Sequence, residues 1–249
     1  MTLFRNVVFV AALAGLVAGL FLAAMQAYAT VPLIIQAETY EAAGGGDHHH
    51  GEEATADHSH GDEAVAHAHD EEAWAPADGF ERFFYTTMAA IVTAIGFGLV
   101  LVVVSEFAGG IAGWRQGLFW GLAGFAVFTL APGLGLPPEL PAMPAADLGA
   151  RQAWWLATVV ATGVGLALIV FRRTPALAAL GVVLIAAPHI VGAPLPASFE
   201  TPVPEGLHHN FVVAVTVTNL LFWAVLGSVA GALRARFADE AEAAQKSFA

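Results

Sequence analysis

The chain has 249 residues, of which 57% are hydrophobic and 12% charged, and its mean hydropathy is +0.68. Water-soluble domains of this length carry a charge at about every fourth residue, so this composition excludes an ordinary soluble enzyme or binding domain. The formal net charge of −12 disfavours nucleic acid as a partner. The sequence therefore predicts a protein whose main solvent is the lipid bilayer.

Long uncharged runs predict the fold class, which is an all-α polytopic integral membrane bundle with six transmembrane helices. About 20 apolar residues cross a hydrocarbon core of about 30 Å, and six uncharged runs reach that length. Pro132 and Pro188 shorten the third and fifth helices. The expected helices, in chain order, are 7–31, 83–105, 115–131, 153–171, 175–191 and 210–233. The expected divisions are 1–41 (first helix and its outer extension), 42–79 (an external loop), 80–233 (a five-helix membrane bundle) and 234–249 (a cytoplasmic tail).

The first helix has features of a secretory signal, because Arg5 precedes its apolar stretch and Ala27-Tyr28-Ala29 is similar to a cleavage site. Its apolar stretch is longer than the 7–15 residues of a signal, so we expect a retained helix, with cleavage as the alternative. Small residues recur every four positions along it, and two glycine pairs repeat this spacing later in the chain. We interpret these stripes as packing seams inside the bundle, with a seam for another subunit as the alternative. They are Ala11, Gly15, Gly19, Ala23 and Ala27, Gly117 and Gly121, and Gly227 and Gly231.

The segment 42–79 lacks any apolar period and combines acidic residues with seven histidines. Its low hydrophobicity and dense negative charge predict disorder in the absence of a ligand. Neutral imidazole binds Co, Ni, Cu(II) and Zn ions, so we expect this loop to capture transition-metal ions loosely, with a merely polar spacer as the alternative. The seven residues are His48, His49, His50, His58, His60, His67 and His69.

Six further side chains are expected on the same side of the membrane as this loop. Carboxylate and imidazole groups at the mouth of a helical bundle are suitable transient ligands for a divalent cation. Structural roles remain open for the histidines, which can simply hold backbone carbonyls. The six are Glu38, Glu139, Asp147, His189, His208 and His209.

The distribution of charge predicts the orientation. With both termini in the cytoplasm, the inner side receives seven of the nine Lys and Arg residues, and the outer side receives 17 of the 21 Asp and Glu residues. The His-rich loop is then periplasmic or extracellular. The acidic outer face attracts cations.

Several chemistries are unsupported by the sequence. The chain has no cysteine, so thiolate ligands and disulfides are excluded. It has no phosphate-binding Gly-x-x-x-x-Gly-Lys loop, no Gly-x-Ser-x-Gly elbow and no His-Glu-x-x-His zinc motif. We therefore expect neither an enzyme nor a permanently bound cofactor. The predicted helices also lack internal carboxylates and histidines, which weighs against unassisted movement of a bare divalent ion.

Four stretches resemble the CbtA family of cobalt transporter subunits. They are the Leu-Pro-Pro-Glu-Leu-Pro to Arg-Gln-Ala-Trp-Trp segment at 136–155, and the segments 31–41, 74–82 and 188–194. The resemblance implies a bacterial inner-membrane protein that acts with a small histidine-bearing membrane subunit in cobalt uptake linked to cobalamin supply. The family is usually described with five spanning segments, whereas the apolar runs here number six.

Together these features predict a transport subunit that captures Co²⁺, or Ni²⁺, on the external His-rich loop and passes it to the mouth of the bundle. Protonation of the imidazoles below about pH 6.5 should weaken this capture. The alternative is a membrane-tethered metal buffer or sensor that conducts no ions. A membrane metalloenzyme is a third reading, which requires the five residues of the mouth (Glu38, Glu139, Asp147, His189 and His208) to converge at one depth.

Overall fold

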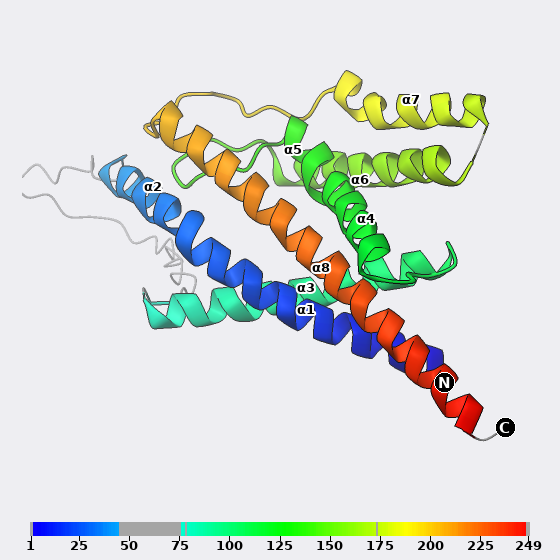
Figure 1. Cartoon of the computed structure of the whole chain (residues 1–249). Coiled ribbons are helices and arrows are strands. Elements are labelled where there is room, and N and C mark those ends of the chain that lie inside the picture. The colour runs from blue at the N-terminus through cyan, green and yellow to red at the C-terminus, as the bar shows by residue number, and fades with distance from the viewer. Residues whose placement is uncertain (1, 45–75, 78, 173, 248–249) are drawn as a thin grey trace, which may run out of the picture.

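The computed structural model describes residues 2–44, 76–77, 79–172 and 174–247, and their regular secondary structure is helical, which confirms the all-α prediction (Figure 1). In chain order the helices are α1 (Thr2–Ala29), α2 (Val31–Gly44), α3 (Phe80–Glu106), α4 (Trp114–Phe125), the π-helix η1 (Ala126–Leu130), α5 (Ala131–Gly135), α6 (Leu148–Phe171), α7 (Pro175–Val191) and α8 (Glu205–Ser247).

All six predicted apolar runs are helical, and five of them are long and apolar enough to cross a membrane. These five are Phe4–Ala29, Phe80–Glu106, Trp114–Gly135, Leu148–Phe171 and Glu205–Phe237. The other apolar helix is α7, which has 17 residues and rises about 25 Å. That length is slightly short of a hydrocarbon core of about 30 Å.

The third run extends past the proline that was expected to end it. Pro132 has no N–H and would collide with the carbonyl of Phe128 in a regular α-helix. The chain instead widens into the π-helix η1 just before this proline, and Pro132 lies at the start of α5. The wider turn lets α4, η1 and α5 continue as a single 22-residue helical segment from Trp114 to Gly135.

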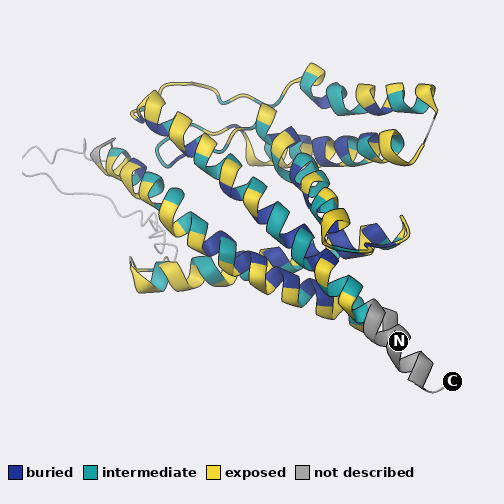
Figure 2. Ribbon diagram, in the orientation of Figure 1, coloured by how far each residue is buried: buried dark blue, intermediate teal, exposed yellow. Residues whose placement is uncertain are grey.

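The main core lies where α1, α3 and α8 cross, and dark blue buried faces concentrate there in Figure 2. Val10 and Ala14 of α1 contribute to this core, as do Phe222, Trp223 and Leu226 of α8. The outward faces of the same helices carry large exposed apolar side chains, as expected of surfaces that face lipid.

Glycines allow the helices to approach closely along the α1–α3 and α4–α8 seams within the bundle. A Cβ added at Gly15 would lie 2.5 Å from the Cα of Ile95, across the α1–α3 seam. A Cβ at Gly117 of α4 would lie 2.1 Å from the carbonyl oxygen of Gly227 of α8. Since these glycines face other helices of the same chain, the small-residue stripes are internal packing seams, except that Ala27 is exposed.

A second core joins segments that are far apart in the sequence at one end of the bundle. Ala37 of α2 packs there with Leu140, with Val203 and with Leu207 and Phe211 at the start of α8. We call this the α2 end. The N- and C-termini lie together at the opposite end (Figure 1), because α8 runs back antiparallel to α1.

Candidate functional site

The segment 45–75, which carries the seven predicted loop histidines, lies outside the described residues, but the helices on either side of it are joined. Glu38 of α2 and Arg82 of α3 form a two-pronged ion pair, in which Nη1 of the arginine donates to Oε2 at 3.1 Å and Nη2 contacts Oε1. Paired geometry of this kind is among the stronger charged contacts. The chain therefore leaves the bundle and returns to it at the α2 end.

Two other predicted carboxylates at this end also have protein partners. Glu139 forms an ion pair with Arg151, in which Oε2 of the glutamate lies 3.0 Å from Nη2 of the arginine. Asp147 caps α6, where its side chain accepts a hydrogen bond from the backbone N–H of Ala150 at 2.8 Å. Such a cap satisfies one of the free N–H groups of the first helical turn, so it gives Asp147 a structural role.

The three described histidines lie at the same end but make different contacts. Nε2 of His208 lies 3.1 Å from the carbonyl oxygen of Pro138, so a proton on that nitrogen completes a hydrogen bond between α8 and the 136–147 segment. His189 of α7 packs edge-to-face on Trp154, with ring centroids 5.8 Å apart. Trp154 in turn donates from Nε1 to the carbonyl of Pro188 at 3.2 Å. His209 is exposed.

The predicted mouth residues are thus collected at one end without converging on a point. Within the described part of the chain, no three His, Asp or Glu side chains lie close enough together to hold a metal ion. Glu38, Glu139, Asp147 and His208 each engage a separate protein group instead.

Sequence reasoning missed the two arginines that pair with these carboxylates. Arg82 and Arg151 are the two basic residues that the predicted topology places on the outer side. Two isolated arginines among many acidic residues at a membrane boundary are expected to pair with carboxylates. This pattern in the sequence could have predicted the two ion pairs.

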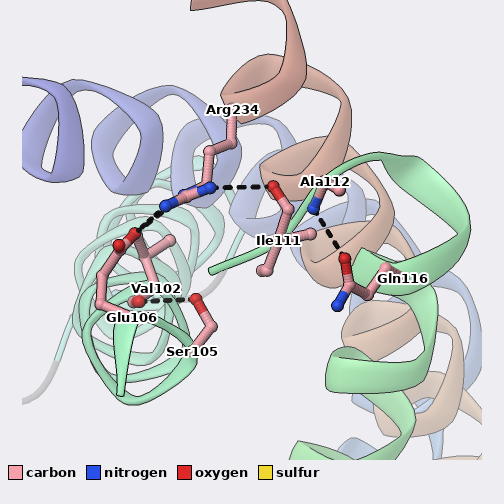
Figure 3. Close-up of polar contacts among 7 residues, drawn as sticks. All are labelled: Val102, Ser105, Glu106, Ile111, Ala112, Gln116 and Arg234. Carbon is pink, nitrogen blue, oxygen red and sulfur yellow. Dashed lines mark hydrogen bonds and ion pairs between the residues drawn. The ribbon is translucent and has the colours of Figure 1, made fainter. Parts of the chain in front are cut away.

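At the opposite end of the bundle, Arg234 of α8 contacts α3 and the turn that precedes α4 (Figure 3). Nε of Arg234 on α8 donates to Oε1 of Glu106 on α3 at 2.8 Å, and its Nη1 donates to the carbonyl of Ile111 at 3.0 Å. Both charged side chains are 25% exposed. The turn from 107 to 113 is further held by the N–H of Ala112, which donates to Oε1 of Gln116 at 2.7 Å. This network joins α3, α4 and α8.

An open apolar groove of about 340 Å³ lies between the η1–α5 segment, α6 and α7. One face of each of these elements lines it, and its accessible lining is almost entirely carbon. The hydroxyl of Thr162 is buried on its wall and has no hydrogen-bond partner. Lining residues include Leu130, Leu134, Thr162, Leu166, Ala186 and His189.

Comparison with known protein families matches residues 4–235 to a family described as "Probable cobalt transporter subunit (CbtA)". The comparisons with curated proteins and with solved structures found no match. The family match covers the described helices except for the first two residues of α1 and the last turns of α8, so nearly all of the membrane bundle lies within it.

Proposed function

Because this chain belongs to the CbtA family of probable cobalt transporter subunits, we propose that it captures Co²⁺ on its histidine-rich segment 42–79 and helps to pass the ion across the membrane. Ni²⁺ is a second candidate cargo, since imidazole ligands do not by themselves select cobalt over nickel. A small histidine-bearing membrane subunit completes the pathway. The step is ligand exchange, with no covalent chemistry and no resident cofactor.

The observation that carries this proposal is the gathering of ligand-type side chains at the α2 end. His189, His208 and His209 all lie there, as do Glu38 and Glu139. The seven remaining histidines belong to the segment that connects α2 to α3 at this same end. Three of the ten histidines lie at this end, and the other seven belong to the segment whose flanking helices, α2 and α3, are joined here by the pair of Glu38 and Arg82.

The distribution of charge supports placing the α2 end on the outer side of a bacterial inner membrane. The opposite end carries Arg115, Arg172, Arg234 and Arg236, as the excess of positive charge on cytoplasmic segments requires. We therefore propose that both termini are cytoplasmic and that α7 crosses the membrane as a sixth, short span. Its shortfall of a few ångströms is within what local thinning of the bilayer accommodates.

The ion pairs at the α2 end suggest how captured metal would be handed inward. A divalent cation arriving from the histidine-rich segment can compete with Arg82 for Glu38, and with Arg151 for Glu139. These carboxylates then serve as transient ligands, which suits an ion that must leave again.

The interior of the bundle gives the reason for a second subunit. Between their ends, the described apolar helices contain no His, Asp or Glu. A divalent ion without ligands costs several kcal/mol or more inside the hydrocarbon region. An ion that crosses the bilayer must therefore stay hydrated in a wet pathway, or it must find ligands on another subunit or on backbone carbonyls.

The lack of His, Asp and Glu in the interior of the described helices favours one alternative function. In it, the chain is a non-conducting metal buffer or sensor that is tethered to the membrane. Such a protein would bind cobalt at its outer segment without needing ligands deeper in the bilayer. Uptake of ⁵⁷Co²⁺ into proteoliposomes, with and without the partner subunit, separates the two functions. Binding without uptake under both conditions favours the buffer or sensor.

The cellular test compares cobalt accumulation in a deletion strain complemented with the natural chain or with variants. The informative variant replaces the seven histidines from His48 to His69 by asparagine, and the matched control replaces Asp57, Asp62 and Asp70 by asparagine. We expect at least a fivefold loss of ⁵⁷Co²⁺ accumulation from submicromolar medium with the histidine variant, and a smaller loss with the control. Equal accumulation by the natural chain and the histidine variant would overturn the capture step.

A further inference from the structure

We propose that Arg82 and Arg151 are specificity-determining residues, which keep Mg²⁺ and Ca²⁺ off the carboxylates of Glu38 and Glu139 and leave those carboxylates to cations that also bind imidazole. The inference rests on the proposed function in one respect, which is that both carboxylates serve as transient ligands of the transported ion. It goes further by saying how the α2 end selects its cargo.

The two ion pairs are alike in composition and in burial. In each, a guanidinium joins a carboxylate from another segment of the chain: Arg82 of α3 contacts Glu38 of α2, and Arg151 of α6 contacts Glu139 in the segment before that helix. The four side chains are between 25% and 37% exposed. They are therefore partly withdrawn from water, yet a cation can still reach them from the solvent.

Partial burial makes these two carboxylates firm sites for a hard cation if they are unpaired. Other carboxylates at the α2 end, including Glu41, Glu200 and Glu205, are exposed, so water and salt screen their attraction for ions. A partly buried charge is screened much less. Carboxylate oxygens are the ligands that Mg²⁺ and Ca²⁺ prefer. Without the arginines, Glu38 and Glu139 would therefore collect these ions.

A paired arginine opposes hard cations more effectively than it opposes cobalt. Every cation has to displace the guanidinium, but Mg²⁺ and Ca²⁺ gain only the carboxylate in return, whereas Co²⁺ and Ni²⁺ also gain from an imidazole nitrogen. The selectivity therefore comes from an equal cost set against unequal gains.

His208 is oriented as such an imidazole ligand would be. Its Nε2 lies 3.1 Å from the carbonyl oxygen of Pro138, the residue that precedes Glu139. A carbonyl oxygen can only accept, so the hydrogen bond requires the proton on Nε2 and leaves Nδ1 as the nitrogen that can bind a metal. Histidine ligands of metal ions are commonly held in this way by a backbone carbonyl.

The ion pair at the opposite end of the bundle lacks this combination. Arg234 contacts Glu106, but it also donates to the carbonyl of Ile111, and none of the ten histidines of the sequence belongs to the segments that meet there. That pair has a structural role, in joining α3 to α8 and to the turn before α4. Pairs of carboxylate and arginine beside histidine are a feature of the α2 end.

Binding of ⁴⁵Ca²⁺ to the purified full-length chain tests the exclusion directly. Arg82→Gln and Arg151→Gln each free one carboxylate, so we expect each variant to bind one additional Ca²⁺ per chain in equilibrium dialysis. The acidic residues of segment 42–79 are the same in every variant, and their contribution cancels in the difference from the natural chain. The control is Arg115→Gln, which removes the same charge from an exposed arginine that lies over the ring of Trp114.

Two further variants separate exclusion from a loss of structure. Arg82→Lys keeps the positive charge, so its Ca²⁺ binding should stay within twofold of that of the natural chain. The double variant Arg82→Gln/Glu38→Gln lacks the freed carboxylate, so the additional Ca²⁺ should disappear. A gain that came only from altered packing of α2 on α3 would persist in the double variant and would overturn the proposal.

Selectivity is measured as inhibition of ⁵⁷Co²⁺ accumulation by Mg²⁺ in the complemented deletion strain. We expect Mg²⁺ to inhibit accumulation at a concentration at least fivefold lower with Arg82→Gln or Arg151→Gln than with the natural chain, at matched protein abundance. Arg115→Gln should behave as the natural chain does.

The proposal fails for either arginine if its glutamine variant binds no additional Ca²⁺ or shows the Mg²⁺ inhibition of the natural chain. An equal gain of Ca²⁺ by Arg115→Gln would reduce the effect to net charge and would overturn it for both. If the natural chain accumulates no ⁵⁷Co²⁺, the transport function is refuted instead. The Ca²⁺ measurements on the purified chain would then still decide whether the arginines exclude hard cations.

Discussion

Two buried threonines on α6 differ in one respect, which is whether their hydroxyl has a hydrogen-bond partner. Thr158 donates to the carbonyl of Trp154 at 2.9 Å, whereas the hydroxyl of Thr162 has none. Both residues are almost fully buried. A polar group buried without a partner costs free energy, whereas the hydroxyl of Thr158 is satisfied by a carbonyl of its own helix.

Replacing each threonine by valine should therefore have opposite effects. We expect Thr162→Val to raise the free energy of unfolding by up to about 1 kcal/mol, because it removes an unsatisfied hydroxyl. Thr158→Val should lower it by less than the roughly 0.6 kcal/mol of a hydrogen bond between membrane helices, because the bond lost lies within one helix. Unfolding in mixed detergent, followed by circular dichroism, measures both variants. A loss of stability in Thr162→Val greater than that in Thr158→Val would contradict this account.

Arg234 joins three segments at the end opposite α2. It contacts the carboxylate of Glu106 and also the carbonyl of Ile111, so its removal leaves two acceptors without their donor. We expect Arg234→Met to lower the free energy of unfolding by about 2 kcal/mol and Glu106→Gln by less, since glutamine can still accept a hydrogen bond. The control is Arg115→Met, because Arg115 is exposed and lies over the ring of Trp114. Equal losses in Arg234→Met and Arg115→Met would show that the network adds no stability.

At the scale of helices, close approach through glycine sets the geometry of the bundle. A Cβ at Gly227 would lie 2.2 Å from the carbonyl oxygen of Gly117, so α4 and α8 would have to separate to admit it. Gly96 of α3 is also helical, but nothing lies within 4 Å of its added Cβ. The same substitution therefore meets crowded backbone at one site and open space at the other.

We expect Gly227→Ala to lower the free energy of unfolding by about 1–3 kcal/mol, as overpacked cores do. Gly96→Ala should be neutral or stabilising by up to about 1 kcal/mol, because alanine favours the helix. Thermal unfolding of the two purified variants gives the comparison. Similar midpoints for both would mean that the seam can relax at little cost.

Cobalt binding by the histidine-rich segment is expected to depend on pH. Imidazole must be neutral to bind a metal ion, and its ordinary pKa is about 6.5, so bound Co²⁺ should be released as the pH falls below that value. Equilibrium dialysis of the purified chain with ⁵⁷Co²⁺ at pH 7.5 and pH 5 should show at least tenfold weaker binding at the lower pH. Replacement of His48–His69 histidines by asparagine should remove most of the binding at pH 7.5. Binding that is the same at both pH values would exclude imidazole capture.

The all-α class and the six apolar helices could be predicted from the sequence because a helix that crosses the bilayer requires a long uncharged run. Only five of the six are long enough to be candidate spans. The run through Pro132 was expected to stop at residue 131, since sequence gives no direct sign that a π-helix will absorb the proline. The helix α2 was expected only as an outer extension, because its apolar residues are mixed with Glu38 and Glu41. Its packing depends on Leu140 and Leu207, which are distant in sequence.

The candidate site was predicted less completely than the fold. Sequence reasoning assigned Glu38, Glu139 and His208 to one end, and they lie there. It could not give their partners, since the pairing of Glu38 with Arg82 depends on how two helices meet in space. The groove beside α7 was also not predicted, because a concave surface between three helices leaves no pattern in any one of them.

At the scale of the whole molecule, the number of membrane crossings decides which side each segment faces. The start of α1 and the end of α8 lie at the same end of the bundle, and α7 runs antiparallel to α6 (Figure 1). An even number of crossings keeps both termini on one side, whereas five crossings would separate them. The geometry therefore favours six crossings, with α7 as the sixth, in spite of its 17-residue length.

Because the chain contains no cysteine, single cysteines can be introduced without background labelling. With six crossings and cytoplasmic termini, Ala197→Cys between α7 and α8 should react with a membrane-impermeant maleimide in spheroplasts. Thr2→Cys and Ser247→Cys should react only after permeabilisation, because both lie on the cytoplasmic side. If α7 did not cross, the accessibilities of positions 197 and 247 would be exchanged while that of position 2 stayed the same. The three positions together therefore distinguish five crossings from six. They also test the orientation, because labelling of position 2 in intact spheroplasts would place the α2 end on the cytoplasmic side.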